Sequence, residues 1–359
     1  MSVGADHSEN RTGPRGRGAT INPADRFTAL RYELDEFSSS EEARPLPTEF
    51  FRDDSQSIIS RNNSPDIGFE TSLNPYRGCE HGCAYCYARP THEYLGFSAG
   101  LDFESKIIVK MNAGPLLRQE LSKPSWKPQV LVMSGVTDCY QPIERKLKLT
   151  RSCLEVLAEF RNPAAIVTKN FLVTRDIDLL QELAKYDAII ATISITTLDA
   201  DLAAKLEPRA STPRARLAAV RELAGAGVPV GVNVAPIIPG LNDHEIPHII
   251  QAAAEAGAYC AHYTIVRLPL AVSQIFPAWL KTHFPDRAET VLGRIRSIRN
   301  GKLNSSQFGQ RMRGEGLLAE QIRRLFEVAS RKFGLNERDF HLSCDGFRRV
   351  EKNQLSLGL

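Results

Sequence analysis

The sequence has no apolar run that approaches the roughly 20 residues needed to cross a bilayer. Its first residues are polar and lack the apolar stretch of a secretory signal peptide. We therefore expect a cytoplasmic protein that does not bind membranes. Nucleotide-binding motifs are also missing, because neither GxGxxG nor GxxxxGK[ST] occurs in the chain.

Cysteine is scarce and unevenly placed, with seven residues in a chain of 359. Disulfide-stabilised secreted domains are usually shorter, denser in cysteine and even in count, so we expect reduced thiols. Four cysteines are scattered singly at positions 139, 153, 260 and 344. The other three, Cys79, Cys83 and Cys86, stand close together.

The net charge of +3 is small, but basic residues gather at one end. From Lys281 onward the chain has 16 Lys and Arg against nine Asp and Glu. Such a surplus can meet phosphate groups, which makes nucleic acid a possible partner. Helices such as 316–332 with solvated Arg and Lys side chains would give the same count, so both interpretations stay open.

Short apolar runs alternate with helical periodicity through the middle of the chain. We expect strands at 71–74, 106–110, 129–133, 164–168, 188–195, 228–234 and 259–266. We expect helices at 146–160, 176–185, 199–206, 213–226, 244–256 and 316–332. This alternation predicts parallel strands joined by helical crossovers, arranged either as a partial barrel or as a doubly wound open sheet.

The segment Cys79–Cys86 has the spacing CxxxCxxC with Tyr85 before the third cysteine. A [4Fe-4S] cluster normally takes four thiolates, so three would leave one iron open to a small molecule. Gly78 and Gly82 let the backbone fold closely around the thiols. The alternatives are a zinc knuckle completed by His81 or His92, and an electron-transfer cluster completed by Cys139.

This loop resembles the signature of the radical S-adenosylmethionine (SAM) superfamily. The similarity extends to the branch of the superfamily that is related to spore photoproduct lyase, and much of it is to members whose substrate is unassigned. The matching segments are Asn74–Pro90, Thr137-Asp138, Thr168-Lys169, Arg175-Asp176, Ser194–Thr197, Glu207–Arg209 and Ala235–Asp243. The resemblance implies an α/β fold, a partial (β/α)6 TIM-type barrel. It also implies a [4Fe-4S] cluster, SAM, and an external electron donor of the flavodoxin or ferredoxin type.

The resemblance assigns roles to single residues of this chain. Cys79, Cys83 and Cys86 would hold the cluster. SAM would be bound by Tyr85, Ser134, Thr137, Asp138, Lys169, Ser194, Arg209 and Asn233. Tyr87 would belong to a hydrogen-relay pathway, and Cys139 would be the catalytic cysteine. Cys139 departs from the pattern of the lyase, because it comes after the neighbouring Asp138, whereas the lyase cysteine comes before its Asp. The Gly-Gly-Glu of many superfamily members is replaced here by residues 133–140.

We accordingly expect an enzyme of lyase or transferase type in which a 5′-deoxyadenosyl radical takes hydrogen from a nucleic-acid lesion or modified base. The alternative is a zinc-stabilised nucleic-acid-binding module without catalysis. We expect a disordered tail over residues 1–20, an arm over 21–60, the barrel over 61–270 and a helical, basic extension over 271–359.

Overall fold

The computed structural model describes residues 14–27, 46–337 and 340–350. In this part of the chain a seven-stranded sheet has the order β10-β9-β8-β7-β6-β3-β2. Neighbouring strands from β3 to β10 are parallel, and β2 is antiparallel to β3. The strands are β2 (Ile59–Arg61), β3 (Thr71–Leu73), β6 (Leu131–Met133), β7 (Ala164–Thr168), β8 (Ile189–Ser194), β9 (Val230–Ile237) and β10 (Cys260–Ile265).

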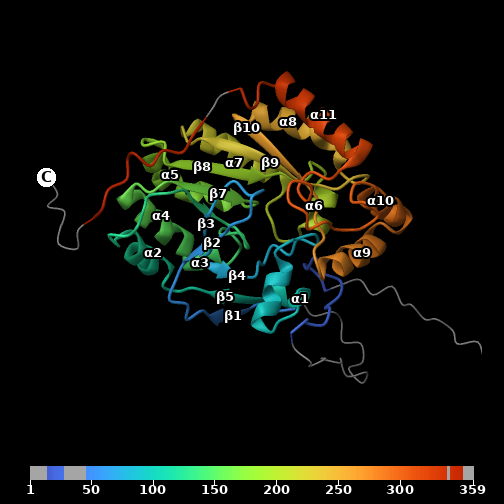
Figure 1. The fold of residues 1–359 in the computed structure, drawn as a ribbon, viewed down its shortest axis with the longest axis horizontal. Helices are drawn as coiled ribbons and strands as arrows, with labels where there is room; N and C mark the ends of the chain where they lie inside the picture. Colours follow the sequence, from blue (N-terminus) through green and yellow to red (C-terminus); the bar gives the residue numbers. More distant parts are fainter. Residues whose placement is uncertain (1–13, 28–45, 338–339, 351–359) are drawn as a thin grey trace, which may run out of the picture.

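Helices follow the parallel strands and lie around the sheet (Figure 1). They are α2 (Ala113–Leu121), α3 (Glu144–Leu147), α4 (Leu149–Phe160), α5 (Ile177–Ala184), α6 (Ala200–Leu206), α7 (Pro213–Gly225) and α8 (Ile246–Glu255). Short elements are α1 (Leu101–Ser105), η1 (Arg89–Leu95), η2 (Phe171–Asp176) and η3 (Asp243–Glu245). Six parallel strands with their helices confirm the α/β fold that the sequence predicts.

The two faces of the sheet differ in burial because side chains alternate along each strand. On β8, Ile189, Ala191 and Ile193 are buried, whereas Ile190 and Thr192 are partly exposed. The buried set belongs to the main hydrophobic core. Ile190 and Thr192 face the inside of the curved sheet, the side on which a site within the barrel would lie.

Two local predictions differ from the structure. The strand expected at 106–110 exists as β5 (Lys106–Val109), but it pairs with β1 (Glu49–Arg52) and β4 (Tyr76–Arg77) in a separate three-stranded sheet. The single helix expected over 146–160 is interrupted at Lys148, whose φ of 54° is left-handed and ends α3 before α4 begins. Apolar periodicity continues across such a break and cannot reveal it.

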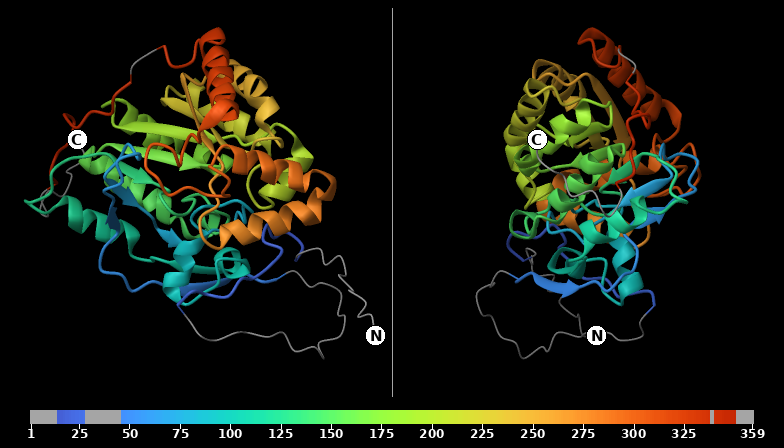
Figure 2. Two further views of the ribbon diagram at one scale, coloured as in Figure 1. Left: turned by 45° about the vertical axis from the view of Figure 1, so that its right-hand side comes forward. Right: turned by 90° about the vertical axis from the view of Figure 1, so that its left-hand side faces the viewer.

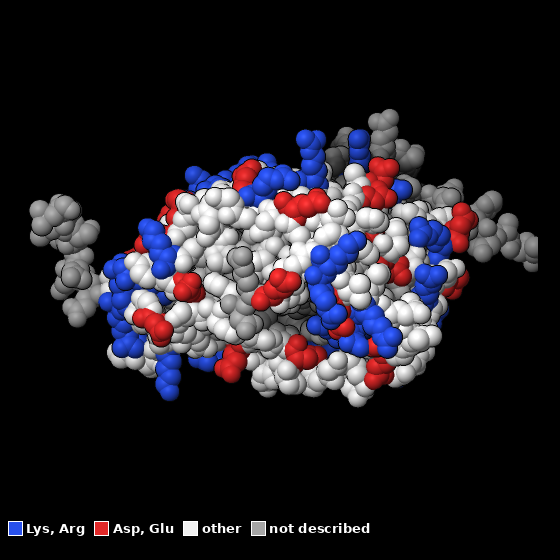
Figure 3. All heavy atoms as spheres, turned by 90° about the horizontal axis from the view of Figure 1, so that it is seen from above, with Lys and Arg blue, Asp and Glu red and all other residues white. Residues whose placement is uncertain are grey.

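The C-terminal region is helical, as expected (Figure 2). It contains α9 (Val272–His283), α10 (Pro285–Ser297) and α11 (Gly316–Lys332), and α11 packs against α8. Figure 3 shows Lys and Arg interspersed with Asp and Glu on the face seen from above.

The segment before α11 closes the gap between the two edges of the sheet. The Ile265 amide of β10 donates to the carbonyl of Met312 at 2.9 Å. The neighbouring Arg311 reaches the loop between β2 and β3, where its Nε donates to Asp66 at 2.7 Å. The partial barrel is therefore bridged from β10 to β2 by a short stretch of the C-terminal region.

Part of the N-terminal segment packs against the cysteine loop. The amides of Gly18 and Ala19 donate to the Glu104 carboxylate at 3.0 and 2.8 Å. A Cβ at Gly18 would lie 1.6 Å from the carbonyl oxygen of Gly82, so only glycine allows this approach. Disorder was expected over residues 1–20, and residues 1–13 lie outside the described part. The same holds for residues 28–45 of the expected arm.

Among the described residues, no helix combines the length and the apolar character needed to traverse a bilayer.

Candidate active site

The cysteine loop follows β3 and lies at the carboxyl ends of the parallel strands, where α/β barrels place their active sites. Gly78 and Gly82 have φ angles of 79° and 67°, which favour glycine. A Cβ on Gly78 would lie 2.9 Å from His92, and one on Gly82 would lie 2.6 Å from the carboxylate of Glu104. Both glycines are thus required by conformation and by space, as the sequence suggested.

A buried ion pair supports this loop from below. Arg89 pairs with Glu104, and both side chains are fully buried. The Arg89 guanidinium also donates to the carbonyl oxygens of Cys83, at 2.9 Å, and Gly82, at 3.2 Å. The backbone that carries the thiols is therefore fixed before any cofactor binds.

The three thiols share an environment that suits metal-bound thiolates. Cys79 and Cys83 are each 7% exposed, and Cys86 is half-buried. Burial, and second the carboxylate of Glu207, raise the pKa of Cys83 to about 12. Burial likewise raises the pKa of Cys79, followed by the charges of Asp138 and the neighbouring thiols. Such thiols stay protonated unless a bound cation stabilises the thiolate, which fits an iron–sulfur cluster.

The residues that would complete a zinc knuckle are engaged elsewhere. His81 contacts Asp138 through Nδ1 at 3.3 Å and Asn170 through Nε2 at 3.2 Å. His92 is fully buried with its Nε2 2.9 Å from the carbonyl oxygen of Lys106. Within the described ranges, no three His, Cys, Asp or Glu side chains gather as a site for one metal ion. Neither histidine is therefore free to complete a zinc knuckle in this arrangement.

Tyr85 is anchored inside the barrel by a polar network. Its hydroxyl contacts the Glu207 carboxylate and lies 3.3 Å from the Thr196 hydroxyl. Glu207 in turn pairs with Arg216, and both are buried. The sequence did not single out Arg216, because an arginine in a helix with solvated neighbours gives no signal of burial.

Lys169 directly follows β7 and reaches toward the loop. Its Nζ lies 5.9 Å from the centre of the Tyr85 ring. Burial lowers its pKa, but the charges of Cys83 and Glu207 outweigh that effect, so that the pKa is raised. No hydrogen bond or ion pair of this ammonium is found among the described residues. Lys169 is therefore a cation available to a ligand.

Ser194 and Asn233 form a row across the inner face of the sheet. They are paired in register on β8 and β9, and Asn233 is paired with His262 on β10, so the three side chains share one face. Neither the Ser194 hydroxyl nor the Asn233 amide has a hydrogen-bond partner in the described part of the chain. Their polar groups are thus available to a ligand inside the barrel.

The loop after β6 is hydrogen-bonded to the end of the neighbouring strand β7. Asp138 accepts from the Thr168 hydroxyl at 2.7 Å and from the Lys169 amide at 2.8 Å. Burial raises its pKa, but His81 and these donors outweigh burial and bring the pKa to about 2. Asp138 is therefore a buried carboxylate that positions Lys169 through its backbone. Its expected contact with SAM remains a prediction.

Ser134 and Thr137 also stabilise this loop. Ser134 has a φ of 83°, and its hydroxyl accepts from the Cys139 amide at 2.9 Å. The Thr137 hydroxyl donates to the carbonyl of Gly78, next to the first cluster cysteine, at 2.6 Å. Both residues are half-buried, and their roles toward SAM remain predictions.

Cys139 and Arg209, which were also expected in the site, make contacts within the protein. Cys139 is fully buried, and burial, followed by the charge of Asp138, raises its pKa. Arg209 pairs with Glu80 of the cysteine loop at 2.9 Å and donates to Thr48 at 3.1 Å. Arg209 thus braces the loop, and the expected function of either residue in catalysis or SAM binding remains a prediction.

Tyr87 stands directly after the third cysteine and is half exposed. It is 51% exposed, yet burial raises its pKa, followed by the charge of Cys86. Its hydroxyl donates to the carbonyl of Gly135 at 2.9 Å, and its ring lies 5.6 Å from the guanidinium carbon of Arg267. The half-exposed ring is therefore accessible to a ligand beside the third cysteine.

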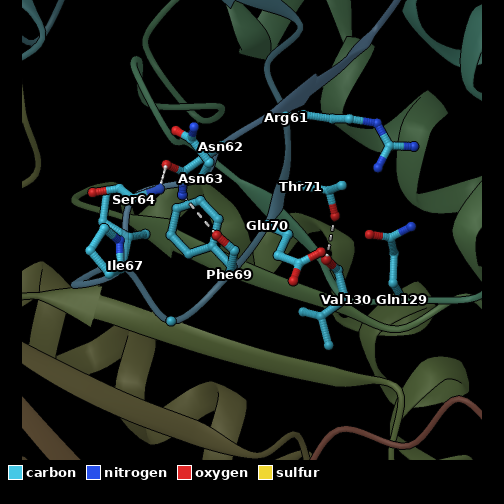
Figure 4. A pocket seen from close by; sticks show the side chains of 12 residues that line it. Arg61, Asn62, Asn63, Ser64, Ile67, Phe69, Glu70, Thr71, Gln129 and Val130 are labelled. Carbon is cyan, nitrogen blue, oxygen red and sulfur yellow. Dashed lines mark hydrogen bonds between the residues drawn. The ribbon is translucent and has the colours of Figure 1, made fainter.

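A separate cavity of about 1060 Å³ lies at the other end of β3 (Figure 4). It is lined by residues of the stretch 61–71 together with Gln129 and Val130. Since Thr71 begins β3 and Val130 precedes β6, this cavity opens at the amino ends of the strands. It is not the site that contains the cysteines.

Comparison with known proteins was consistent with the geometry. The family model described as "Radical SAM superfamily" matches residues 73–253. An uncharacterized protein of Mycobacterium tuberculosis is 35% identical over 226 residues, which are 62% of this chain and 66% of that protein, just under two thirds of its length. A protein of Pseudomonas phage M6, named "Radical SAM Nalpha-GlyT isomerase", is 29% identical over 185 residues, or 51% of this chain and 36% of the relative.

Among solved structures, spore photoproduct lyase complexed with dinucleoside spore photoproduct has a similar fold. The TM-score is 0.57 at 18% sequence identity, with 82% of this chain and 86% of that chain covered. This likeness supports the barrel architecture and the helical C-terminal region.

Proposed function

The chain belongs to the radical SAM superfamily, and on this premise we propose that it is an enzyme that takes a hydrogen atom from a nucleic-acid lesion or modified base. One observation carries the proposal: Cys79, Cys83 and Cys86 stand in one glycine-shaped loop, close enough to affect one another's pKa, and the nearby histidines are engaged with other partners. The family implies a [4Fe-4S] cluster and SAM, and the residues present fit both groups.

Cys79, Cys83 and Cys86 would hold the cluster, and when bound the reduced cluster and SAM supply a 5′-deoxyadenosyl radical. Lys169 would bind the carboxylate of SAM, since its ammonium faces the site without a partner among the described residues. Ser194 and Asn233 would donate hydrogen bonds from the inner face of the sheet. Tyr85, fixed by Glu207, would keep its ring beside the cluster.

Exclusion of water is the further task of this chain, because a carbon radical reacts with whatever is close. The bridge from β10 to β2 through Met312 and Arg311 closes the open side of the barrel. Tyr87 stands half exposed beside the third cysteine, where a relay of hydrogen to or from the substrate would pass. An external electron donor of the flavodoxin or ferredoxin type would reduce the cluster.

The nucleic-acid substrate is supported by charge and by relatives. The basic surplus lies in the C-terminal region, yet several α11 charges are paired there, as in Arg323 with Glu320 and Glu327. Of the similar proteins, spore photoproduct lyase is known in complex with a dinucleoside spore photoproduct, and the Pseudomonas phage M6 protein is named as a radical SAM isomerase. Those names describe the similar proteins, and the substrate of this chain is our proposal.

The test is anaerobic reconstitution with iron and sulfide. We expect about four iron atoms per chain and reductive formation of 5′-deoxyadenosine from SAM. Cys83→Ala should abolish both, because a cluster with two thiolates is not retained. Cys344→Ala is the matched control, since this half-buried thiol lies in the C-terminal segment. The proposal fails if Cys83→Ala cleaves SAM as fast as the parent.

A further inference from the structure

Arginine side chains gather where the C-terminal segment meets β10. Arg267 follows β10, Arg299 follows α10, and Arg311 and Arg313 belong to the segment that bridges the barrel. We call these four residues the arginine cluster. Burial, followed by the charge of Arg311, lowers the pKa of Arg267, and burial, followed by the charge of Arg267, lowers that of Arg299. Arg313 lies beside β10, where its charge, after burial, lowers the pKa of His262.

Donors in the cluster are buried without acceptors. Arg299 is 3% exposed, and its Nη2 donates to the Val266 carbonyl at 2.7 Å. Its Nε and Nη1 have no partner among the described residues, and neither has the buried Nε of Arg267. Leaving a buried donor unpaired is unfavourable, and more so when the group is charged. An acceptor that carries negative charge would remove this cost.

Carboxylates in the described part of the chain do not balance the cluster. Asp66 pairs with Arg311 alone. The guanidinium of Arg313 lies 4.1 Å from the centre of the Tyr263 ring and makes no ion pair with a described residue. Glu315, which is close in sequence, accepts from the Asn300 amide at 3.0 Å. One carboxylate for four guanidinium groups leaves a concentrated positive charge.

The arginine cluster reaches the cysteine loop through Arg267. The guanidinium carbon of Arg267 lies 5.6 Å from the ring centre of Tyr87, the half-exposed residue that follows the third cysteine. On its other side Arg267 contacts the Met312 sulfur through Nη1 at 3.6 Å. A ligand group held by the cluster would therefore sit at the edge of the reaction space.

We propose that Arg267, Arg299 and Arg313 bind a phosphodiester group of a polynucleotide substrate next to the nucleotide that reacts. Guanidinium groups suit phosphate because they donate two parallel hydrogen bonds in one plane. The choice of a polynucleotide as the ligand rests on the proposed function. The unpaired buried donors favour binding of an oxyanion whether or not that function is correct.

The test is fluorescence anisotropy of the anaerobically reconstituted protein with a labelled single-stranded oligodeoxynucleotide, measured over a range of salt concentrations. Arg267→Gln and Arg313→Gln should each weaken binding about ten-fold and lower the salt slope by about one. Arg324→Gln is the matched control, because its side chain is 73% exposed on α11. This control should bind within about two-fold of the parent. Iron content verifies folding of each variant, and Arg299→Gln serves as a third variant if it keeps its iron.

Two further probes identify the source of the phosphate. An oligonucleotide with neutral methylphosphonate linkages should bind weakly to the parent protein. Its affinity for Arg267→Gln should be the same, because the arginine then has no phosphate charge to bind. Thymidine 5′-monophosphate should bind much more weakly than the oligonucleotide, and equal affinity would overturn the polynucleotide assignment. Unchanged binding in both arginine variants would overturn the site itself. SAM cleavage by the parent without oligonucleotide is measured separately, so a failure of the proposed function is distinguished from a failure of the site.

Discussion

His92 shows how one buried side chain limits the conditions under which the cysteine loop is stable. It lies between the rings of Phe97 and Phe103, each 5.5 Å away, and packs against Gly78. Its Nδ1 is buried without a partner among the described residues. Burial lowers its pKa from 6.5 to about 4, so the neutral ring is required in the folded state.

We predict a loss of stability as the pH falls from 7 to 5. The unfolded chain binds a proton at His92 below pH 6.5, whereas the folded protein resists it until about pH 4. Stability contributed by the neutral ring is therefore present above pH 6.5 and lost as the pH falls toward 4. At pH 5 the loss should be about 2 kcal/mol relative to pH 7.

Urea unfolding of the parent and of His92→Gln at both pH values measures this effect. Glutamine keeps a donor for the Lys106 carbonyl but does not titrate, so the difference between the two proteins should shrink or reverse at pH 5. A parallel loss of stability in parent and variant would show that His92 is not responsible.

Residue-level prediction from the sequence succeeded where spacing carries the chemistry. The three cysteines and the two glycines around them are recognisable because only those residue types suit a cluster loop. The buried pairs Arg89–Glu104 and Arg216–Glu207 were not recognised as supports. Each pair joins residues that look like ordinary surface charges, and burial of a charge is decided by tertiary packing.

Elements were predictable where an apolar run is short and bounded by turn residues. The run at 164–168 is β7 with the same limits, and the helix with Arg and Lys side chains expected at 316–332 is α11. The partner of β5 was not predictable, because strand pairing depends on contacts far apart in sequence. The break at Lys148 depends on a single backbone angle.

The N-terminal segment yields a prediction at this scale. Gly18→Ala places a methyl group on the carbonyl of Gly82, so the segment must separate from the cysteine loop. The two amide bonds to Glu104 are then lost, and the loop becomes more mobile. We expect iron release to a chelator under anaerobic conditions to be about ten-fold faster, equivalent to ~1.4 kcal/mol.

Gly68→Ala is the control for this experiment, because a Cβ at Gly68 meets no atom within 4 Å. Its iron release should match that of the parent. If Gly18→Ala also matches the parent, the segment does not stabilise the cluster loop.

At the scale of the whole molecule, the sheet is an incomplete barrel that a distant segment closes. The bridge joins a loop near residue 66 to residues near 312, which no local pattern connects. Arg311 and Asp66 are 14% and 11% exposed, and Arg311 holds the pKa of Asp66 at about 2. The pair is thus largely shielded from solvent, so removing one partner should cost more than it does in a surface ion pair.

Breaking this pair should open the barrel at β10 before it affects the strands inside the sheet. In Asp66→Asn the bridging segment loses its anchor, so the Ile265 amide, which donates to Met312, should exchange with deuterium about ten-fold faster, or ~1.4 kcal/mol. The Ile195 amide, bonded to Asn233 at 2.9 Å within the sheet, is the internal reference and should not change. In a double-mutant cycle, Arg311→Gln should add little to Asp66→Asn, because both remove the same contact. Full additivity, or unchanged exchange at Ile265, would mean that the barrel is held closed by packing of the C-terminal region and not by this ion pair.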